Sequence, residues 1–290
     1  MKIALVTYHD NGKYHLINGA NEDDSLLDFL KTKGYHITKE IWNDPAVKWE
    51  NYDLVILKSP WDYFDLIEDF YTWLAKLENQ KVKLLNPIDI VKWNADKHYL
   101  QEIEKAGLRV TPSTFLAKGD QINLATYFEL FSADQLIVKP CVSGGSKNTF
   151  KVTTTNVEEI NTTLAQLILH EDFIVQPFLK EIEEQGEWSF LFFNGKFSHA
   201  ILKKAKEGDF RVQASFGGTV HAQNASVEYL NTAQQYVNEF ANGCLYARVD
   251  GTIIDKEFYL MELELIEPFL FLAEHQDSLT NYYEALKQLT

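Results

Sequence analysis

The chain has 290 residues, of which 46% are hydrophobic and 13% aromatic, and this composition indicates a folded protein and excludes a disordered one. A formal net charge of −15 argues against nonspecific binding to nucleic acid or to an anionic membrane surface. The two cysteines, Cys141 and Cys244, match no zinc spacing and no disulfide framework, so we expect a reducing, cytoplasmic setting. No apolar run approaches the length of a membrane span, and the apolar run at the N-terminus is too short for a signal peptide.

The first part of the chain alternates strand and helix patterns, which is typical of an α/β unit with a mainly parallel sheet. Short apolar or alternating runs predict strands at residues 2–7, 35–41, 54–58 and 82–85. Amphipathic runs predict helices at residues 25–33 and 67–77. We expect this first domain to span residues 1–92.

The rest of the chain predicts two further domains, at residues 93–180 and 181–290. Asn194-Gly195 predicts a two-residue hairpin turn, and such antiparallel signals concentrate in the C-terminal part, where we expect α+β structure. The expected helices lie at residues 95–106, 157–170 and 227–241, and the expected strands at residues 136–139, 173–176, 188–192 and 197–203.

An acidic strand pair lies near the end of the chain. A turn centred on Lys256 sets Asp250 opposite Glu262 and Arg248 opposite Glu264, and all four of these side chains then share one face of a sheet. Two facing carboxylates cost free energy unless something neutralises them, and Mg²⁺ prefers oxygen ligands. The pattern therefore predicts a metal site with Asp250, Glu262 and Glu264 as ligands, and the alternative is an exposed acidic hairpin.

A glycine-rich loop follows the strand that ends at Lys139-Pro140. It contains Ser143, Gly144, Gly145 and Ser146. The two glycines let backbone N–H groups approach a phosphate closely, and Lys139 can point at the same phosphates. The loop does not have the spacing of a Walker loop, and an ordinary hairpin turn is the alternative interpretation.

A connecting segment after the strand at residues 173–176 can bind a flat ring. Phe178 and Leu179 can flank a heterocycle, and the backbone from Gln176 onward can form hydrogen bonds with the edge of that ring. Glu187, which opens the next strand, can accept hydrogen bonds from ribose hydroxyls. A plain interdomain linker is the alternative.

Two more loops carry candidate residues. Arg211, in a polar and glycine-rich turn, is a candidate clamp on a transferring phosphoryl group, and a solvated surface arginine is the alternative. Residues 59–63 follow a buried strand, and ligands of open α/β sheets bind beyond the carboxyl ends of strands, so this loop is a candidate substrate contact.

Taken in order, these residues resemble the ATP-grasp superfamily of carboxylate–amine ligases over roughly residues 90–270. The resemblance implies an ATP-grasp fold, in which an N-terminal parallel-sheet domain is followed by two α+β subdomains that clasp ATP. It implies that Arg248 steadies the reacting carboxyl group and that Glu264 is a departure, because the family usually has Asn there. The other implied roles are nucleotide-binding lysines (Lys97, Lys139), a flexible phosphate loop (Ser143 to Lys147), an adenine hinge (Gln176, Phe178, Leu179), a ribose-binding acid (Glu187) and Mg²⁺ ligands (Asp250, Glu262, Glu264).

Four short motifs in order narrow the resemblance to a glutathione-synthetase-like branch that includes the cycloserine-forming ligase. They are Trp-Asp-Tyr, Ser-Gly-Gly-Ser, Asp-Phe-Arg-Val-Gln and Glu-Leu-Ile-Glu-Pro. The run at residues 243–250 is also similar to the corresponding strand of D-alanine–D-alanine ligase.

The resemblance implies an ATP-dependent ligase that joins a carboxylate to an amine through an acyl phosphate, with Mg²⁺ or Mn²⁺. We expect small, amino-acid-like carboxylate and amine substrates and neither nucleic acid nor a membrane as partner, and the oligomeric state stays open, a dimer included. Two alternatives are a phosphotransferase on the same fold and an ATP-binding protein without turnover.

Overall fold

The structure is a computed structural model that describes residues 1–9, 22–206, 212 and 217–290. The chain forms two compact units: a larger unit of residues 1–94 and 181–290, and a smaller unit of residues 95–180. The first and last parts of the chain therefore share one unit. The finer division at residues 1–92, 93–180 and 181–290 stays a proposal, and residue 92 lies inside the helix α3, Ile88–Asn94.

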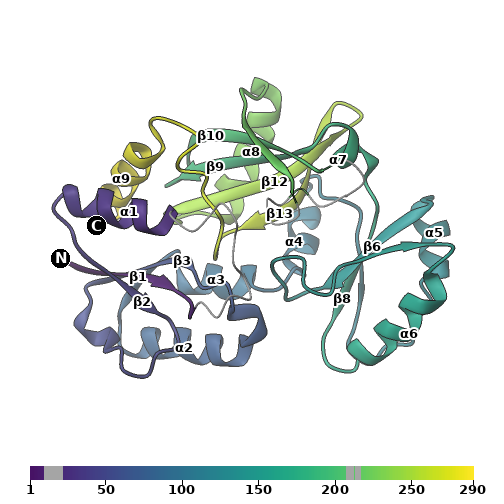
Figure 1. The fold of residues 1–290 in the computed structure, drawn as a ribbon, viewed down its shortest axis with the longest axis horizontal. Coiled ribbons are helices and arrows are strands. Elements are labelled where there is room, and N and C mark those ends of the chain that lie inside the picture. Colours follow the sequence, from purple (N-terminus) through teal and green to yellow (C-terminus); the bar gives the residue numbers. More distant parts are fainter. Residues whose placement is uncertain (10–21, 207–211, 213–216) are drawn as a thin grey trace. The chain divides into compact units, whose positions relative to one another are not determined.

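A four-stranded parallel sheet opens the larger unit, and it confirms the α/β prediction for this part of the chain (Figure 1). The strand order is β2-β1-β3-β4. Every residue of β3 is buried, which explains why its sequence is a continuous apolar run rather than an alternating one. The elements are β1 (Lys2–Thr7), α1 (Glu22–Thr32), β2 (His36–Ile41), β3 (Leu54–Ser59), α2 (Ile67–Asn79), β4 (Lys83–Leu85) and α3, with short 3₁₀ turns at Trp49–Asn51 and Tyr63–Asp65.

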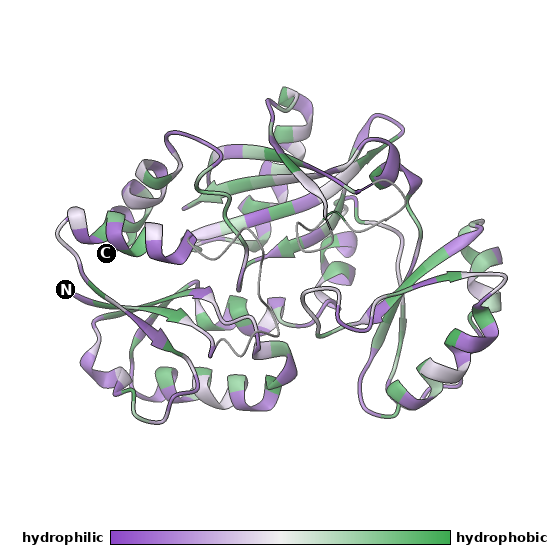
Figure 2. Ribbon diagram, in the orientation of Figure 1, coloured by the Kyte–Doolittle hydropathy of each residue, from purple (hydrophilic) through white to green (hydrophobic). Residues whose placement is uncertain are grey.

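Helix α2 illustrates how the sequence pattern builds this layer. Its buried residues Phe70, Trp73, Leu74 and Leu77 recur every three or four positions, so they form one apolar stripe, and Figure 2 shows the matching alternation of hydrophobic and hydrophilic residues along the helix. Trp42 packs edge-on against both Phe70 and Trp73. Each such fully buried side chain stabilises the fold by about 1.5–3 kcal/mol.

A five-stranded antiparallel sheet completes the larger unit, in the order β11-β10-β9-β12-β13. Helix α8 packs on one face, where Phe258 contacts both Phe190 and Tyr236. The ionisable side chains of the acidic strand pair lie on the opposite face. The elements are α7 (Lys180–Glu184), β9 (Glu187–Phe193), β10 (Lys196–Lys204), β11 (Thr219–Ala222), α8 (Val227–Phe240), β12 (Tyr246–Ile254), β13 (Glu257–Glu264) and α9 (Ser278–Leu289).

Both hairpins of this sheet combine a tight turn with a β-bulge. Asn194-Gly195 and Asp255-Lys256 all have positive φ angles, as a type I′ turn requires, and this confirms the turn predicted at Asn194-Gly195. Ser198 in β10 and Met261 in β13 have no partner in the ladder, so the register shifts by one residue at each of them. The bulges decide which residues face each other farther along the strands.

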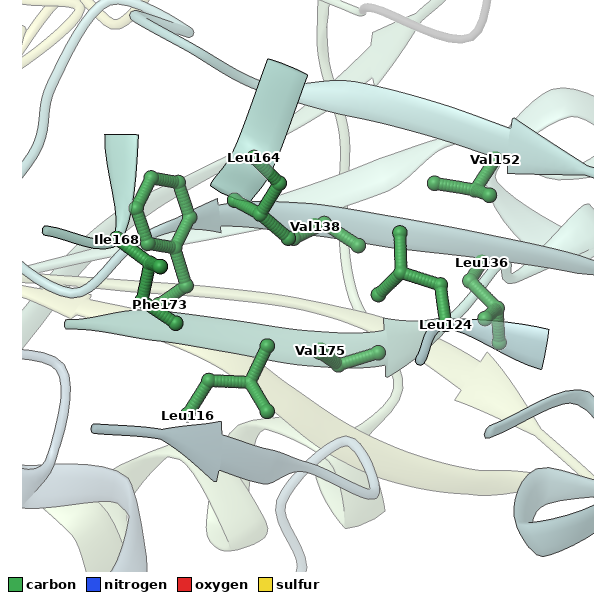
Figure 3. Packing of buried hydrophobic residues seen from close by; sticks show 9 residues of the cluster. All are labelled: Leu116, Leu124, Leu136, Val138, Val152, Leu164, Ile168, Phe173 and Val175. Atoms are coloured by element: carbon green, nitrogen blue, oxygen red, sulfur yellow. The ribbon is translucent and has the colours of Figure 1, made fainter. Parts of the chain in front are cut away.

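The smaller unit is a four-stranded antiparallel sheet, ordered β5-β8-β6-β7, with helices packed on one face. Figure 3 shows the core between the sheet and the helices, in which Leu136, Val138 and Phe173 from the strands meet Leu164 and Ile168. The elements are α4 (Tyr99–Lys105), β5 (Thr114–Leu116), α5 (Ala125–Phe131), β6 (Gln135–Pro140), β7 (Phe150–Thr153), α6 (Val157–Leu167) and β8 (Phe173–Pro177).

The helix expected at residues 95–106 begins later than predicted, at Tyr99. The reason lies in the preceding backbone. The N–H of Lys97 donates to the carbonyl of Cys141 at 3.0 Å, and the N–H of His98 donates to the Asp96 carboxylate at 2.9 Å. These bonds hold residues 95–98 in a turn.

Among the described residues, no helix is both long enough and apolar enough to cross a membrane.

Candidate active site

The acidic hairpin, formed by β12 and β13, has the register that the sequence predicted. Asp250 pairs with Glu262, and Arg248 pairs with Glu264. The tight turn alone is centred between Asp255 and Lys256, so the extra residue Met261 is what brings these pairs into register. All four ionisable residues therefore lie on the face of the sheet away from α8.

Arg248 is the buried centre of this face. Its Nε donates to Asp250 Oδ1 at 3.0 Å, its Nη2 donates to Asp250 Oδ2 at 2.8 Å, and Nη2 also pairs with Glu264. Burial alone would raise the pKa of Asp250, but Arg248 and Lys203 outweigh it and hold that pKa well below its usual range. Asp250 is therefore ionised and fixed in place.

Lys203 and Ser189 extend the network, and the sequence analysis did not identify either of them. Lys203 Nζ lies 2.5 Å from Glu187 Oε1 and 3.2 Å from Asp250 Oδ2, and Ser189 Oγ donates to Asp250 Oδ1 at 2.7 Å. Glu187 is buried, and burial raises its pKa although Lys203 opposes the rise. Glu187 lies opposite Lys203 across the β9–β10 hairpin, but counting from the Asn194-Gly195 turn does not predict this pair, because the bulge at Ser198 shifts the register.

The donor set on this face fits a hard cation. Asp250, Glu262 and Glu264 share one face on neighbouring strands, and Mg²⁺ prefers oxygen ligands such as their carboxylates. Burial, together with the charges of Asp250 and Glu262, raises the pKa of Glu264 to about 7 against the effect of Arg248. A bound cation would relieve this carboxylate crowding. The Asp250 side chain is 4% exposed and already held by two cations, whereas that of Glu264 is 22% exposed and more accessible to an ion.

A segment of irregular backbone, residues 266–272, lies beside Arg248 and is fixed by side chains. Arg248 Nη1 donates to the carbonyl of Phe269 at 3.0 Å, and its guanidinium carbon lies 5.8 Å from the centre of the Phe271 ring. The other side chains that bond its carbonyl groups are Tyr246 at Ile266 (2.8 Å), Trp61 at Glu267 (3.1 Å), His199 at Leu270 (3.0 Å) and Ser278 at Leu272 (2.5 Å). Trp61 belongs to the loop at residues 59–63, so the structure assigns this tryptophan a structural contact.

His199 gives this segment a pH dependence. Burial lowers the pKa of His199 to about 4, and His275, stacked at 5.7 Å, adds to the effect. The unfolded chain thus binds a proton that the folded chain does not between pH 6.5 and about 4, so the stability contribution present above pH 6.5 is lost as the pH falls. We expect urea unfolding to show a loss of about 3 kcal/mol over this range, beyond the carboxylate background.

The matched variants are His199→Gln and His221→Gln, since His221 is exposed on β11. His199→Gln should flatten the pH dependence, whereas His221→Gln should keep it. Equal slopes in wild type and His199→Gln would contradict the assignment.

In the smaller unit, Lys97 and the glycine-rich loop are in contact. Lys97 is buried, and its Nζ donates to the carbonyl of Ser143 at 2.8 Å. Ser143 Oγ in turn donates to the carbonyl of Pro140 at 2.9 Å. Beyond Ser143 the backbone turns through left-handed positions at Gly145 and Ser146. Lys97 therefore braces the start of the loop, while Gly144 to Ser146 form its partly exposed tip.

The sheet face away from the core of the smaller unit carries the other nucleotide candidates. Ile137 pairs with Gln176 on one side and with Lys151 on the other, and Lys139 lies two residues farther along the same face. Gln176 is buried, and its amide donates to Ser113 Oγ at 2.9 Å. This face thus combines apolar surface with amino groups.

The connecting segment at residues 178–179 is half-buried. The N–H of Phe178 donates to the carbonyl of Gln135 at 2.9 Å, and Lys151 Nζ lies 3.8 Å from the centre of the Phe178 ring. Lys151 was not predicted from the sequence, although it lies in the strand that directly follows the glycine-rich loop. Leu179 continues this segment.

The structure groups the predicted residues by unit. Glu187, Arg248, Asp250, Glu262 and Glu264 share one sheet face in the larger unit. The remaining described candidates belong to the smaller unit, and they are Lys97, Lys139, Ser143, Gly144, Gly145, Ser146, Gln176, Phe178 and Leu179. Arg211 lies outside the described residues.

Comparisons with known protein families match most of the chain. Residues 100–272 match the family described as “Prokaryotic glutathione synthetase, ATP-grasp domain”, and residues 3–86 match the family described as “D-cycloserine synthetase DcsG, N-terminal domain”. A protein of Streptomyces lavendulae, “Cycloserine biosynthesis protein DcsG”, is 26% identical over 284 residues, which cover 91% of this chain and 92% of that protein.

Solved structures share the fold over the whole chain. The crystal structure of D-cycloserine synthetase DcsG has a TM-score of 0.86 at 25% identity, with both chains fully covered. D-alanine–D-alanine ligase from Bacillus anthracis, complexed with ATP, has a TM-score of 0.75 at 16% identity and covers 100% of this chain and 97% of its own. The fold is therefore the ATP-grasp fold, as the sequence resemblance implied.

Proposed function

The chain belongs to the prokaryotic glutathione synthetase ATP-grasp family, which makes it an ATP-dependent ligase that joins a carboxylate to an amine, and we propose that the reaction passes through an acyl phosphate. The observation that carries the proposal is the acidic hairpin. A buried arginine, Arg248, is held there between Asp250 and Glu264 on a face that also presents Glu262. Fixed positive charge beside metal-type ligands is what an acyl-transfer site requires.

The smaller unit binds the nucleotide in this proposal. Lys97 and Lys139 neutralise phosphate charge, and the backbone N–H groups from Gly144 to Ser146 lie against phosphate oxygens. The segment from Gln176 to Leu179 holds adenine against the sheet face. The N–H of Phe178 is already bonded to the carbonyl of Gln135. Other backbone groups of this segment therefore form the hydrogen bonds with the edge of the adenine ring.

The metal ligands come from the acidic hairpin. Glu262 and Glu264 would hold Mg²⁺ or Mn²⁺, and Asp250 would contribute to the same site. When bound, the cation supplies charge neutralisation at the phosphates. The crowding of Glu262 and Glu264 supports this assignment, because it raises the pKa of Glu264 and is relieved by positive charge.

The remaining charged groups on this face position and stabilise the reacting groups. Burial acts to lower the pKa of Arg248, but Asp250 and Glu264 outweigh it, so the guanidinium stays charged. Arg248 then stabilises the oxyanion that develops when an amine attacks the acyl phosphate. Lys203 offers a second fixed positive charge beside the guanidinium of Arg248. Glu187, which pairs with Lys203, accepts hydrogen bonds from the ribose hydroxyls in this proposal.

The substrates are small molecules of the amino-acid or peptide class, and we propose an amino-acid-like carboxylate and amine. This rests on the relatives, which include a cycloserine biosynthesis protein and a D-alanine–D-alanine ligase. The test is ATP-dependent phosphate release with Mg²⁺, screened over amino acids and small carboxylates, singly and in pairs. A pair that releases phosphate faster than either member alone supports ligation, whereas release with no dependence on any acid or amine contradicts it.

Nucleotide binding can be tested separately. Calorimetry with a nonhydrolysable ATP analogue and Mg²⁺ should give binding heat for the wild type, and Lys139→Ala should weaken binding by on the order of 10-fold or more, since one charge-assisted contact is worth about 1.5–3 kcal/mol. Lys105→Ala is the matched control, because Lys105 is exposed in the same unit. Absence of heat and of a thermal shift at millimolar analogue would contradict the assignment.

A further inference from the structure

A buried ion pair of the larger unit lies outside the chemistry described so far. Lys58, in β3, is 1% exposed, and its Nζ lies 2.9 Å from Glu22 Oε1 and 3.2 Å from Asp23 Oδ1. Burial acts to lower the pKa of Lys58, but Glu22 and Asp23 outweigh it and raise that pKa, so the ammonium stays charged. The Lys58 ammonium is thus a fixed positive charge against the Glu22 carboxylate inside the unit.

Glu22 uses its carboxylate to hold the segment at residues 266–272. Its Oε1 accepts from the N–H of Leu270 at 2.8 Å, and its Oε2 accepts from the N–H of Leu272 at 3.0 Å. Phe271, between them, has a φ of 52°, in the left-handed region. Such a change of backbone hand turns neighbouring N–H groups toward one anion, so the segment forms an anion-binding nest around Glu22.

The same segment contacts Arg248 through the immediate neighbours of the residues that Glu22 binds. Phe269, whose carbonyl accepts from Arg248 Nη1 at 3.0 Å, directly precedes Leu270. Phe271, whose ring lies 5.8 Å from the guanidinium carbon, stands between the two residues that Glu22 binds. A shift of the nest therefore moves both groups that contact Arg248 from this side.

We propose that Glu22 and Lys58 are positioning residues for Arg248: Lys58 holds the Glu22 carboxylate in the nest, and Glu22 fixes the backbone against which the guanidinium is aligned. The inference rests on the proposed role of Arg248 in ligation. Stability alone is a poor explanation for the pair, because apolar residues of similar volume serve a buried position as well as or better than an ion pair. Catalytic geometry is a better one, since a misplacement of about 1 Å costs roughly 100-fold in rate.

The test compares Glu22→Gln, Lys58→Met and the double variant with the wild type. Gln keeps the shape of Glu, but its NH₂ group meets a backbone N–H where the carboxylate oxygen accepted one. We expect Glu22→Gln to lower kcat roughly 10- to 100-fold with little change in KM for ATP. Asp24→Asn is the matched control, because Asp24 is exposed on the same helix and pairs only with surface Lys39 among the contacts described. It should leave kcat unchanged.

The double variant separates positioning from stability. It removes both buried charges, so its unfolding free energy should recover relative to either single variant, whereas kcat should stay low because the nest still lacks its second acceptor. Recovery of kcat together with stability would overturn the proposal, and so would a Glu22→Gln enzyme with wild-type kcat.

Amide hydrogen exchange at Leu270 and Leu272 gives a readout that does not depend on turnover. Both amides should exchange faster in Glu22→Gln than in wild type or Asp24→Asn, and unchanged exchange would overturn the proposal. A wild type that forms no amide with any substrate pair contradicts the proposed function, whereas an active wild type matched by Glu22→Gln contradicts the positioning role alone.

Discussion

Replacing Arg248 with alanine is expected to lower kcat by about 100-fold or more, as the loss of one preorganised oxyanion donor does in other acyl-transfer enzymes. In the proposed role the guanidinium acts mainly on charge that develops in the transition state, so KM for ATP should change less than kcat. Steady-state kinetics with the substrate pair found by phosphate release measures both. Arg109→Ala is the control, because Arg109 is exposed in the smaller unit and should leave kcat near the wild-type value.

Removing Arg248 should also lower the stability of the fold. Its removal leaves Asp250 and Glu264 with less positive charge in a buried network, and breaking such a pair costs about 3–5 kcal/mol. Arg248→Lys keeps the charge while losing the two-pronged contact with Asp250, so it should fold better and still lose much of kcat. A folded Arg248→Lys or Arg248→Ala enzyme with wild-type kcat would contradict the role assigned to this residue.

Replacing Glu262 with glutamine is expected to abolish turnover while the fold survives. Glu262 lies opposite Asp250, and two facing carboxylates are unfavourable without a cation. Losing one of them should leave the metal-free stability unchanged or improved, whereas metal-dependent ATP turnover should be lost. Activity over a range of Mg²⁺ concentrations and urea unfolding with a chelator present measure the two effects.

Glu257→Gln is the matched variant on the same strand, at the turn end of β13 and away from the paired carboxylates. It should retain turnover. Marked unfolding of Glu262→Gln without metal would indicate that Glu262 belongs to a structural network instead of a metal site.

The sequence predicted the parallel sheet and the hairpins because their signals are local. The apolar run of β3 and the Asn194-Gly195 turn each contain the information that defines them. The start of α4 was not predictable in this way. It depends on the bond from the Lys97 N–H to the distant Cys141 carbonyl, which no local pattern reveals.

The sheet face that carries the candidate site shows the same limit. The register of the acidic hairpin followed from the carboxylates and an assumed turn centre at Lys256, although the structure reaches it through a tighter turn and the bulge at Met261. Counting back from the Asn194-Gly195 turn places Leu202 opposite Glu187, and only the bulge at Ser198 brings Lys203 there. A bulge has no reliable sequence signature, so Lys203 was missed.

The segment at residues 266–272 was beyond sequence reasoning for a different reason. Its groups are held by side chains that are distant in the chain: Glu22 and Trp61 lie near the start of the sequence, and His199 lies in β10. Its own sequence has no repeat or motif that predicts a nest. Short elements such as β5 and α5, with few residues to set a period, were missed as well.

Trapping with hydroxylamine tests the central claim most directly. With Mg²⁺, ATP, the carboxylate substrate and hydroxylamine in place of the amine, the wild type should form the hydroxamate of that acid together with ADP and phosphate, because an acyl phosphate reacts readily with this nucleophile. Arg248→Ala should form it far more slowly. ATP turnover that yields a stable phosphate ester, with no hydroxamate at any hydroxylamine concentration, would contradict ligation through an acyl phosphate.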